Sequence, residues 1–162
     1  MITIEKAIEK LSEDEAKEIL LKYAKKNQSL KDIIILKFSK TITVAQKRKW
    51  ERETDKIISR FGGDAGYIDY KYVYDFDSYI IDFLRERADL LINNGLLDDA
   101  YEFVCMIYKE ISAIELIDPD SECEAEYICM EYFREILSKS DENKMRKMID
   151  ELVKIGIDTD VL

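Results

Sequence analysis

Chain-breaking residues are scarce in this sequence, which contains one proline and five glycines among its 162 residues. Proline and glycine interrupt helices more strongly than any other residues, and a chain of many short strands needs them at its reversals. Leu, Ile, Lys, Glu and Ala are abundant instead, and most of these are strong helix formers. We therefore expect an all-α protein of long helices, about seven to eight in number.

Helix start signals and apolar spacing divide the chain into these helices. Ser12 with Glu15, and Thr43 with Gln46, have the spacing of capping boxes, in which two side chains satisfy free backbone N–H groups at a helix start. Apolar residues that recur every three or four positions then predict helices over residues 4–11, 12–27, 29–40, 43–61, 69–94, 97–118, 125–137 and 141–156. The connections are short, so consecutive helices should lie antiparallel and stack as pairs.

The helix predicted to start after Asp69 is the longest, and it carries two apolar stripes about 120° apart. One stripe consists of Tyr70, Val73, Tyr74, Ile81, Leu84, Ala88 and Leu91. The other consists of Tyr72, Phe76, Tyr79, Phe83 and Leu90. Because apolar residues cover so much of its circumference, this helix should lie at the centre of a layered arrangement, with Tyr74 and Ile81 both buried.

The length suits a single helical domain over residues 1–162, but the charge is unevenly distributed along it. Residues 1–61 hold 15 Lys and Arg against 10 Asp and Glu, whereas residues 62–162 hold 10 against 25. We therefore distinguish basic N-terminal helices, 1–61, from an acidic helical-pair region, 67–156. The net charge of -10 repels nucleic acid overall, although the basic third could attract it.

The sequence contains no histidine, and its three cysteines, Cys105, Cys123 and Cys129, lack paired spacing. The commonest general base and the commonest zinc ligand are therefore missing, and three thiols at these spacings cannot close a zinc site. Nothing distinguishes a catalytic carboxylate pair among the 35 acidic residues. We expect a protein that is not an enzyme and holds no metal or cofactor, although a hydrolase that uses two carboxylates stays open.

The cysteine content and the hydropathy also indicate a location. An odd number of cysteines argues against a disulfide framework and favours a reducing compartment. The longest aliphatic run, Ile33 to Leu36, is far shorter than the roughly 20 residues that cross a bilayer, and the N-terminus does not have the pattern of a signal peptide. We expect a cytoplasmic protein that makes no membrane contact, and the oligomeric state is not predicted.

Three segments of the chain resemble a known family. They are LSEDEAKEILLKYAKKNQSLKDIIILKF, GYIDYKYVYDFDSYIIDFL and INNGLLDDAYEFVCMIYKEISAIELIDPDSE. Together they are similar to the helical-repeat region that accompanies SWIM-type zinc fingers in bacterial proteins, over residues 11–140. The resemblance implies a tetratricopeptide-like (TPR-like) or related right-handed α-α superhelix that acts as an interaction scaffold. The finger needs Cys-x-Cys followed by Cys-x-His, which this chain lacks, so zinc and DNA binding do not carry over.

The densest aromatic region of the chain lies at residues 67–79 and contains six aromatic side chains. One explanation is core packing of the central helix. The other is a tyrosine-lined groove that accepts a partner helix or an extended peptide, because tyrosine combines a rigid apolar face with a polar tip. For the second explanation, the partner-binding residues are Tyr67, Tyr70, Tyr72 and Tyr79.

Four basic residues, Arg48, Arg52, Lys56 and Arg60, recur every four positions and should line one edge of their helix. Such neighbours repel one another unless opposite charges or counterions offset the repulsion. The candidates are carboxylates of the same fold, an external acidic protein or nucleic acid, or solvent and salt alone. Our leading hypothesis is a non-catalytic helical interaction module that binds a protein partner. The alternative is a nucleic-acid-associated accessory factor that uses the basic stripe at residues 44–61.

Overall fold

The computed structural model describes residues 3–62, 66–117 and 123–158. Within these residues the chain forms eight helices and one two-stranded sheet, which confirms the predicted all-α class and the number of helices. None of these helices combines the length and the apolar character that crossing a membrane requires. The chain divides into two compact units, residues 1–38 and residues 39–162, which we describe separately as unit 1 and unit 2.

Unit 1 contains α1 (Ile4–Ile8), α2 (Glu13–Ala24) and α3 (Gln28–Phe38). Ser12 and Glu15 form the predicted capping box at the start of α2. The next helix begins one residue before the predicted Ser29, and the Asn27 side chain accepts a hydrogen bond from the backbone N–H of Leu30 over 3.1 Å. Little of this unit is buried, since only Ala24 and Leu36 among its described residues are.

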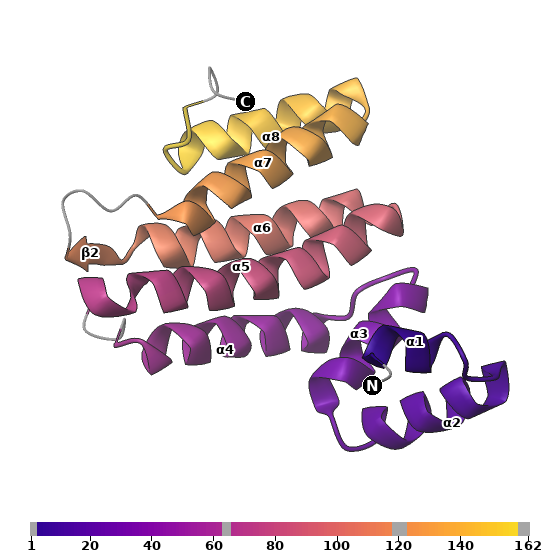
Figure 1. The fold of residues 1–162 in the computed structure, drawn as a ribbon. Helices are drawn as coiled ribbons and strands as arrows, with labels where there is room; N and C mark the ends of the chain where they lie inside the picture. The colour runs from indigo at the N-terminus through magenta and orange to yellow at the C-terminus, as the bar shows by residue number, and fades with distance from the viewer. Residues whose placement is uncertain (1–2, 63–65, 118–122, 159–162) are drawn as a thin grey trace. The chain divides into compact units, whose positions relative to one another are not determined.

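Unit 2 contains the remaining five helices, α4 (Val44–Arg60), α5 (Tyr70–Asn93), α6 (Leu97–Ser112), α7 (Glu124–Lys139) and α8 (Glu142–Lys154). Thr43, Asp69 and Asp141 cap α4, α5 and α8, each side chain accepting a hydrogen bond from a backbone N–H of the first turn, which for Thr43 is one half of the predicted capping box. Consecutive helices run antiparallel (Figure 1). Helix α5 ends before Gly95, whose positive φ of 72° is a conformation that favours glycine.

Each helix of unit 2 contacts the next one along the chain, and α4 and α5 also contact the next but one. Helix α4 contacts both α5 and α6, α5 contacts both α6 and α7, and α7 contacts α8. Trp50 of α4 is buried against Phe103 of α6, with ring centroids 5.1 Å apart and the planes steeply inclined. Helix α5 therefore has neighbours on several sides, as its two predicted stripes required.

A short parallel ladder joins two connections of unit 2. Strand β1 (Tyr67–Asp69) pairs with β2 (Glu115–Ile117), and Ile68 lies opposite Leu116. The helix predicted over residues 97–118 was therefore too long, because α6 ends at Ser112 and the chain then becomes extended. The extended backbone of β2 satisfies its polar groups by pairing with β1 instead of continuing a helix.

The buried side of α5 differs from the prediction at its first turns. Ile81 is buried with 5% of its surface exposed, whereas Tyr74 exposes 82% and Tyr70 exposes 68%, so the predicted burial of Tyr74 was wrong. The apolar count misassigned these two positions because it treated tyrosine as a fully apolar residue. Two charged side chains, Asp77 and Arg87, lie in the buried arc instead.

Candidate functional site

The basic row of α4 lies on the exposed side of that helix. Arg48, Arg52, Lys56 and Arg60 are all exposed, while the buried residues of α4 are Trp50, Thr54 and Ile58. Among the residues that the structure describes, Arg48, Arg52 and Lys56 form no ion pair. The described acidic residues of the fold therefore do not neutralise these three charges by pairing with them.

The other two basic residues of α4 make a useful contrast, since both of them have carboxylate partners. Lys47 bridges to α6, with its Nζ 2.8 Å from an Asp99 carboxylate oxygen and in contact with Glu102 as well. These carboxylates raise the pKa of Lys47 by accepting hydrogen bonds from its ammonium group. The Nζ of Lys49 lies 3.7 Å from a carboxylate oxygen of Glu53 on the same helix. Lys47 and Lys49 thus have carboxylate partners, whereas Arg48, Arg52 and Lys56 form no ion pair with the described acidic residues.

The end of the row meets the tyrosines of α5. The guanidinium carbon of Arg60 lies 4.4 Å from the ring centroid of Tyr79 and 5.5 Å from that of Phe61. The two rings are themselves 5.6 Å apart. A cation at this distance over an aromatic face is attracted by the ring quadrupole, and a guanidinium can stack there while its N–H groups stay available. The basic row and the tyrosines, which were predicted separately, therefore meet at Arg60 and Tyr79.

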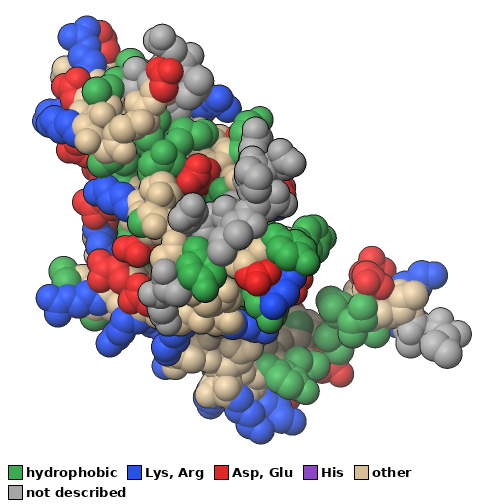
Figure 2. All heavy atoms as spheres, turned by 90° about the vertical axis from the view of Figure 1, so that its left-hand side faces the viewer, with side chains coloured by type: hydrophobic (Ala, Val, Ile, Leu, Met, Phe, Trp, Pro, Cys, Tyr) green, Lys and Arg blue, Asp and Glu red, His purple; other side chains and the backbone are tan. Residues whose placement is uncertain are grey.

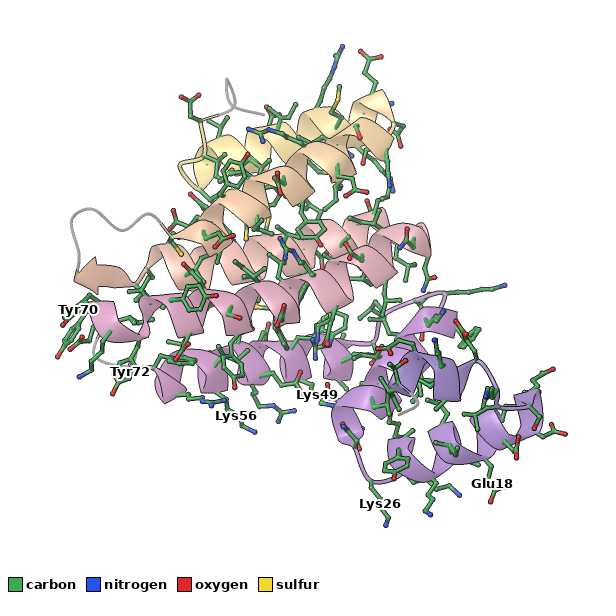
Figure 3. All side chains as sticks on the ribbon, in the orientation of Figure 1. Glu18, Lys26, Lys49, Lys56, Tyr70 and Tyr72 are labelled. Atoms are coloured by element: carbon green, nitrogen blue, oxygen red, sulfur yellow. The ribbon has the colours of Figure 1, made fainter. Side chains whose placement is uncertain are left out.

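Not all of the predicted tyrosines belong to that surface. Tyr67, Tyr72 and Tyr79 expose 44–46% of their surface, and Tyr70 exposes more, so core packing does not explain them. At about 100° per residue, Tyr72 and Tyr79 share one side of α5, whereas Tyr70 and Tyr74 lie on roughly the opposite side. Figure 3 shows the side chains of Tyr70 and Tyr72 leaving α5 in different directions, and Lys56 on the side of α4 that faces away from α5.

We therefore define the basic-aromatic surface as Arg48, Arg52, Lys56, Arg60, Tyr72 and Tyr79. The ammonium group of Lys71 lies 4.8 Å from the ring centroid of Tyr72, which adds a second contact between a cation and an aromatic face next to it. Figure 2 views the molecule from the end at which α5 begins, and shows hydrophobic and tyrosine side chains (green) at the surface among basic ones (blue). Tyr67 and Tyr70 lie at this end but outside the surface as defined.

A hollow of about 450 Å³ between α6 and α8 is the other candidate in unit 2. It is lined in part by Tyr101, Cys105, Lys109, Glu151 and Lys154. Burial raises the pKa of the Cys105 thiol to about 11, so this thiol is protonated at neutral pH and is a poor nucleophile. The Tyr101 hydroxyl donates a hydrogen bond to the carbonyl of Met148 over 3.0 Å, a contact that holds α8 to α6.

A buried carboxylate is the remaining place at which to look for chemistry. Burial raises the pKa of Asp77, and it does the same for Glu126, where the Asp77 charge adds to the effect. Asp77 accepts hydrogen bonds from the Cys123 thiol and from the backbone N–H of Glu124, so its oxygens serve the start of α7. Over the described ranges of the chain, no group of three or more His, Cys, Asp or Glu side chains could hold a metal ion.

Comparisons of the chain with models of protein families, with curated proteins and with solved structures found no match. The resemblance to the SWIM-associated helical repeats therefore stays a prediction. What sequence reasoning missed is the contact between Arg60 and Tyr79. One signal could have indicated it, because Arg60 ends one helix and the next begins after a short glycine-containing connection, which brings antiparallel neighbours together.

Proposed function

We propose that this protein is a non-catalytic helical interaction module that binds an acidic segment of a partner protein on its basic-aromatic surface. The observation that carries the proposal is the contrast within α4. Lys47 and Lys49 have carboxylate partners, whereas Arg48, Arg52 and Lys56 have none among the described residues. Like charges four residues apart destabilise a helix by about 0.2–0.5 kcal/mol per pair, and an acidic partner would relieve that repulsion.

The aromatic part of the surface supports a protein partner. Arginine and tyrosine are the residue types most enriched at the energetic centres of protein interfaces. Arg60 and Tyr79 are already in contact, so part of the entropy cost of ordering these side chains is met before a partner arrives. An acidic segment with apolar side chains between its carboxylates would match both halves of the surface.

Nucleic acid is the second candidate, and the same unpaired row is the observation in its favour. The charge of the unit that carries the row weighs against it. Residues 39–162 hold 17 Lys and Arg against 28 Asp and Glu, and the field of such a unit repels a polyanion as dense as a duplex. A short acidic peptide can instead lie along the row without meeting the acidic helices.

The wider context of the proposal rests on the same observations. The antiparallel helices of unit 2, with contacts between α4 and α6 and between α5 and α7, suit a helical-repeat superhelix of the TPR-like kind, which presents an extended surface to partners. The three cysteines are free, as they would be in the reducing cytoplasm. We therefore propose a cytoplasmic scaffold role.

The test compares three forms of the full chain. One is the wild type, one carries Arg52→Glu with Lys56→Glu, and the control carries Lys147→Glu with Lys154→Glu on α8, where both lysines are exposed. The control changes the net charge by the same amount. Each form is immobilised, and the proteins retained from extracts of the native cells, prepared with and without nuclease treatment, are quantified by mass spectrometry.

We expect a set of acidic proteins that the wild type and the control retain and the α4 variant loses. Equal retention by all three forms would contradict the proposal. Retention that nuclease abolishes would favour the nucleic-acid alternative, which salt-dependent binding of a 20-base-pair duplex, followed by fluorescence anisotropy, would then confirm. The α4 variant should melt at the same temperature as the wild type or higher at low salt, because it removes repulsion and breaks no ion pair.

A further inference from the structure

Unit 1 leaves its apolar side chains largely uncovered. Of the large apolar side chains described in residues 3–38, only Leu36 is buried. Ile4, Ile8, Ile19, Leu20, Leu21, Tyr23, Ile35 and Phe38 expose between 44% and 78% of their surface. A helical unit with so little buried area has little to offset its loss of chain entropy on folding. Exposed apolar surface of this extent marks an interaction site.

Part of this surface is hollowed. Helices α2 and α3 enclose an open groove of about 460 Å³, whose apolar lining is Leu20, Leu21, Ala24, Ile34 and Ile35. Lys17 and Lys31 stand at its border, and Lys17 is paired with Glu13 on its own helix. The groove lies wholly within unit 1, and we call it the α2-α3 groove.

Apart from Lys17, which is paired with Glu13, the charges along α2 are sorted by position. Glu13, Asp14, Glu15 and Glu18 lie in its first half, whereas Lys22 lies in its second half and Lys25 and Lys26 directly follow it. Figure 3 shows Glu18 on this helix and Lys26 beyond its C-terminal end. Asp14, Glu18, Leu21 and Lys25 are spaced by four, three and four residues, so they follow one line along the border of the groove. Among the described residues, Asp14, Glu18 and Lys25 form no ion pair.

A two-fold axis that crosses α2 next to Leu21 would bring the acidic half of one copy beside the basic half of the other. Such an axis places a second α2 antiparallel to the first, with Glu18 of each copy beside Lys25 of the other. It also lays one α2-α3 groove face to face with the other, so that four helices enclose their apolar side chains together. A parallel arrangement would instead place acidic half against acidic half.

From the groove and this charge order we infer that the α2-α3 groove is a self-association site, and that its occupant is the same groove of a second copy of this chain. The charges of unit 1 permit the association, since residues 1–38 hold 8 Lys and Arg against 7 Asp and Glu and carry almost no net charge. This inference does not rest on the proposed function, which concerns other residues.

The first experiment measures the mass of the full chain by sedimentation equilibrium from micromolar to about 100 µM, a range that spans the affinities of many homodimers. We expect a concentration-dependent dimer. Leu21→Glu should give a monomer with unchanged helicity, because Leu21 is already 59% exposed in one copy. Val153→Glu is the matched control, since Val153 on α8 is 55% exposed, and it should leave the dimer intact.

The second experiment tests the orientation of the two copies. Glu18→Lys places two lysines opposite one another at each of two symmetric contacts, and Lys25→Glu places two acids there. Each variant should dimerise on the order of tenfold more weakly than the wild type, because attraction becomes repulsion at both contacts. An equimolar mixture of the two variants should recover wild-type affinity as a heterodimer, because every lysine then faces an acid.

Three results would overturn the inference. One is a wild type that stays monomeric over the whole range. Another is a monomer that Leu21→Glu makes less stable to heat, which would assign the apolar face to an occupant from the same chain. The third is a dimer that neither the Leu21 variant nor the charge variants weaken, or that the mixture does not restore, since its interface would then lie elsewhere.

Discussion

The carboxylate of Asp77, a residue of α5, accepts a hydrogen bond from the backbone N–H of Glu124, the first residue of α7, over 3.3 Å. The N-cap residue of α7 is Cys123, whose side chain makes no capping hydrogen bond to that helix. Asp77 therefore performs from a neighbouring helix the task that an N-cap side chain usually performs from its own, and it places a negative charge at the positive end of α7.

Removal of this contact should destabilise unit 2. Asp77→Ala removes the acceptor of a part-buried N–H at the start of α7, and we expect it to lower the free energy of unfolding by about 0.5–2 kcal/mol, as the loss of an N-cap does. Urea denaturation followed by circular dichroism measures the change. Asp75→Ala is the control on the exposed side of the same helix and should stay within about 0.5 kcal/mol. Equal effects at the two positions would show that Asp77 does not cap α7.

The raised pKa of Asp77 predicts a pH dependence with a definite sign. Burial favours the protonated form, so the folded protein holds this proton to a higher pH than the unfolded chain, whose Asp77 titrates near 3.8. The part of the stability that depends on this bound proton is therefore complete below that pH and is lost as the pH rises through the folded-state pKa. The difference in unfolding free energy between the wild type and Asp77→Asn should favour the wild type more at about pH 3.5 than at about pH 7. A difference that grows toward neutral pH would contradict this sign.

Because the guanidinium of Arg87 is buried, the loss of the Glu53 carboxylate on α4 should lower the stability of unit 2. The Arg87 side chain is 5% exposed. Its guanidinium nitrogens lie 3.2 Å from a carboxylate oxygen of Glu53 on α4 and 3.3 Å from one of Glu86. Glu53→Gln leaves this charge buried with Glu86 as its main partner, and we expect a loss of about 1–3 kcal/mol, at or below the lower end of what breaking a buried pair costs. Glu51→Gln, on the exposed side of α4, should be close to neutral in the same titration.

The arrangement of α5 predicts unequal effects at two positions of one apolar stripe. Ile81→Ala should cost about 2–5 kcal/mol, as deletions of buried aliphatic side chains do. Tyr74→Ala should stay within about 0.5 kcal/mol, because most of the Tyr74 side chain is already in water. Thermal unfolding of the two variants distinguishes them, and a large loss at Tyr74 would mean that another part of the molecule covers that tyrosine.

Much of the secondary structure of this chain is encoded locally and could be predicted from the sequence. The Ser12–Glu15 box and the caps at Thr43, Asp69 and Asp141 depend on residues two or three positions apart, so local sequence alone identifies them. The pairing of β1 with β2 could not be predicted in that way. Its partners are separated by 48 residues in sequence, and neither strand has a period of its own at three residues in length.

The candidate surface was predictable in its parts and not in their combination. The four-residue spacing of Arg48, Arg52 and Lys56 put them on one side of α4, and the structure places them there. Which tyrosines accompany them depends on how α5 is rotated against α4, which spacing within one helix does not determine. The burial of Asp77 and Arg87 could not be predicted either. Charged residues are not expected on the apolar side of a helix, and their burial is explained only by their partners on other helices.

The ladder between β1 and β2 gives the α5–α6 hairpin an unusual mechanical character. The chain itself joins the two helices at Gly95, and the ladder joins the residues just before α5 to those just after α6. The hairpin is thus fastened at both of its ends. A slip of one helix past the other by one turn, about 5.4 Å, would have to break the ladder as well as the packing between the helices. The two helices should therefore resist shear and move as a single rod, so that a force applied to Tyr72 at one end of α5 is felt at the Gly95 end of both helices.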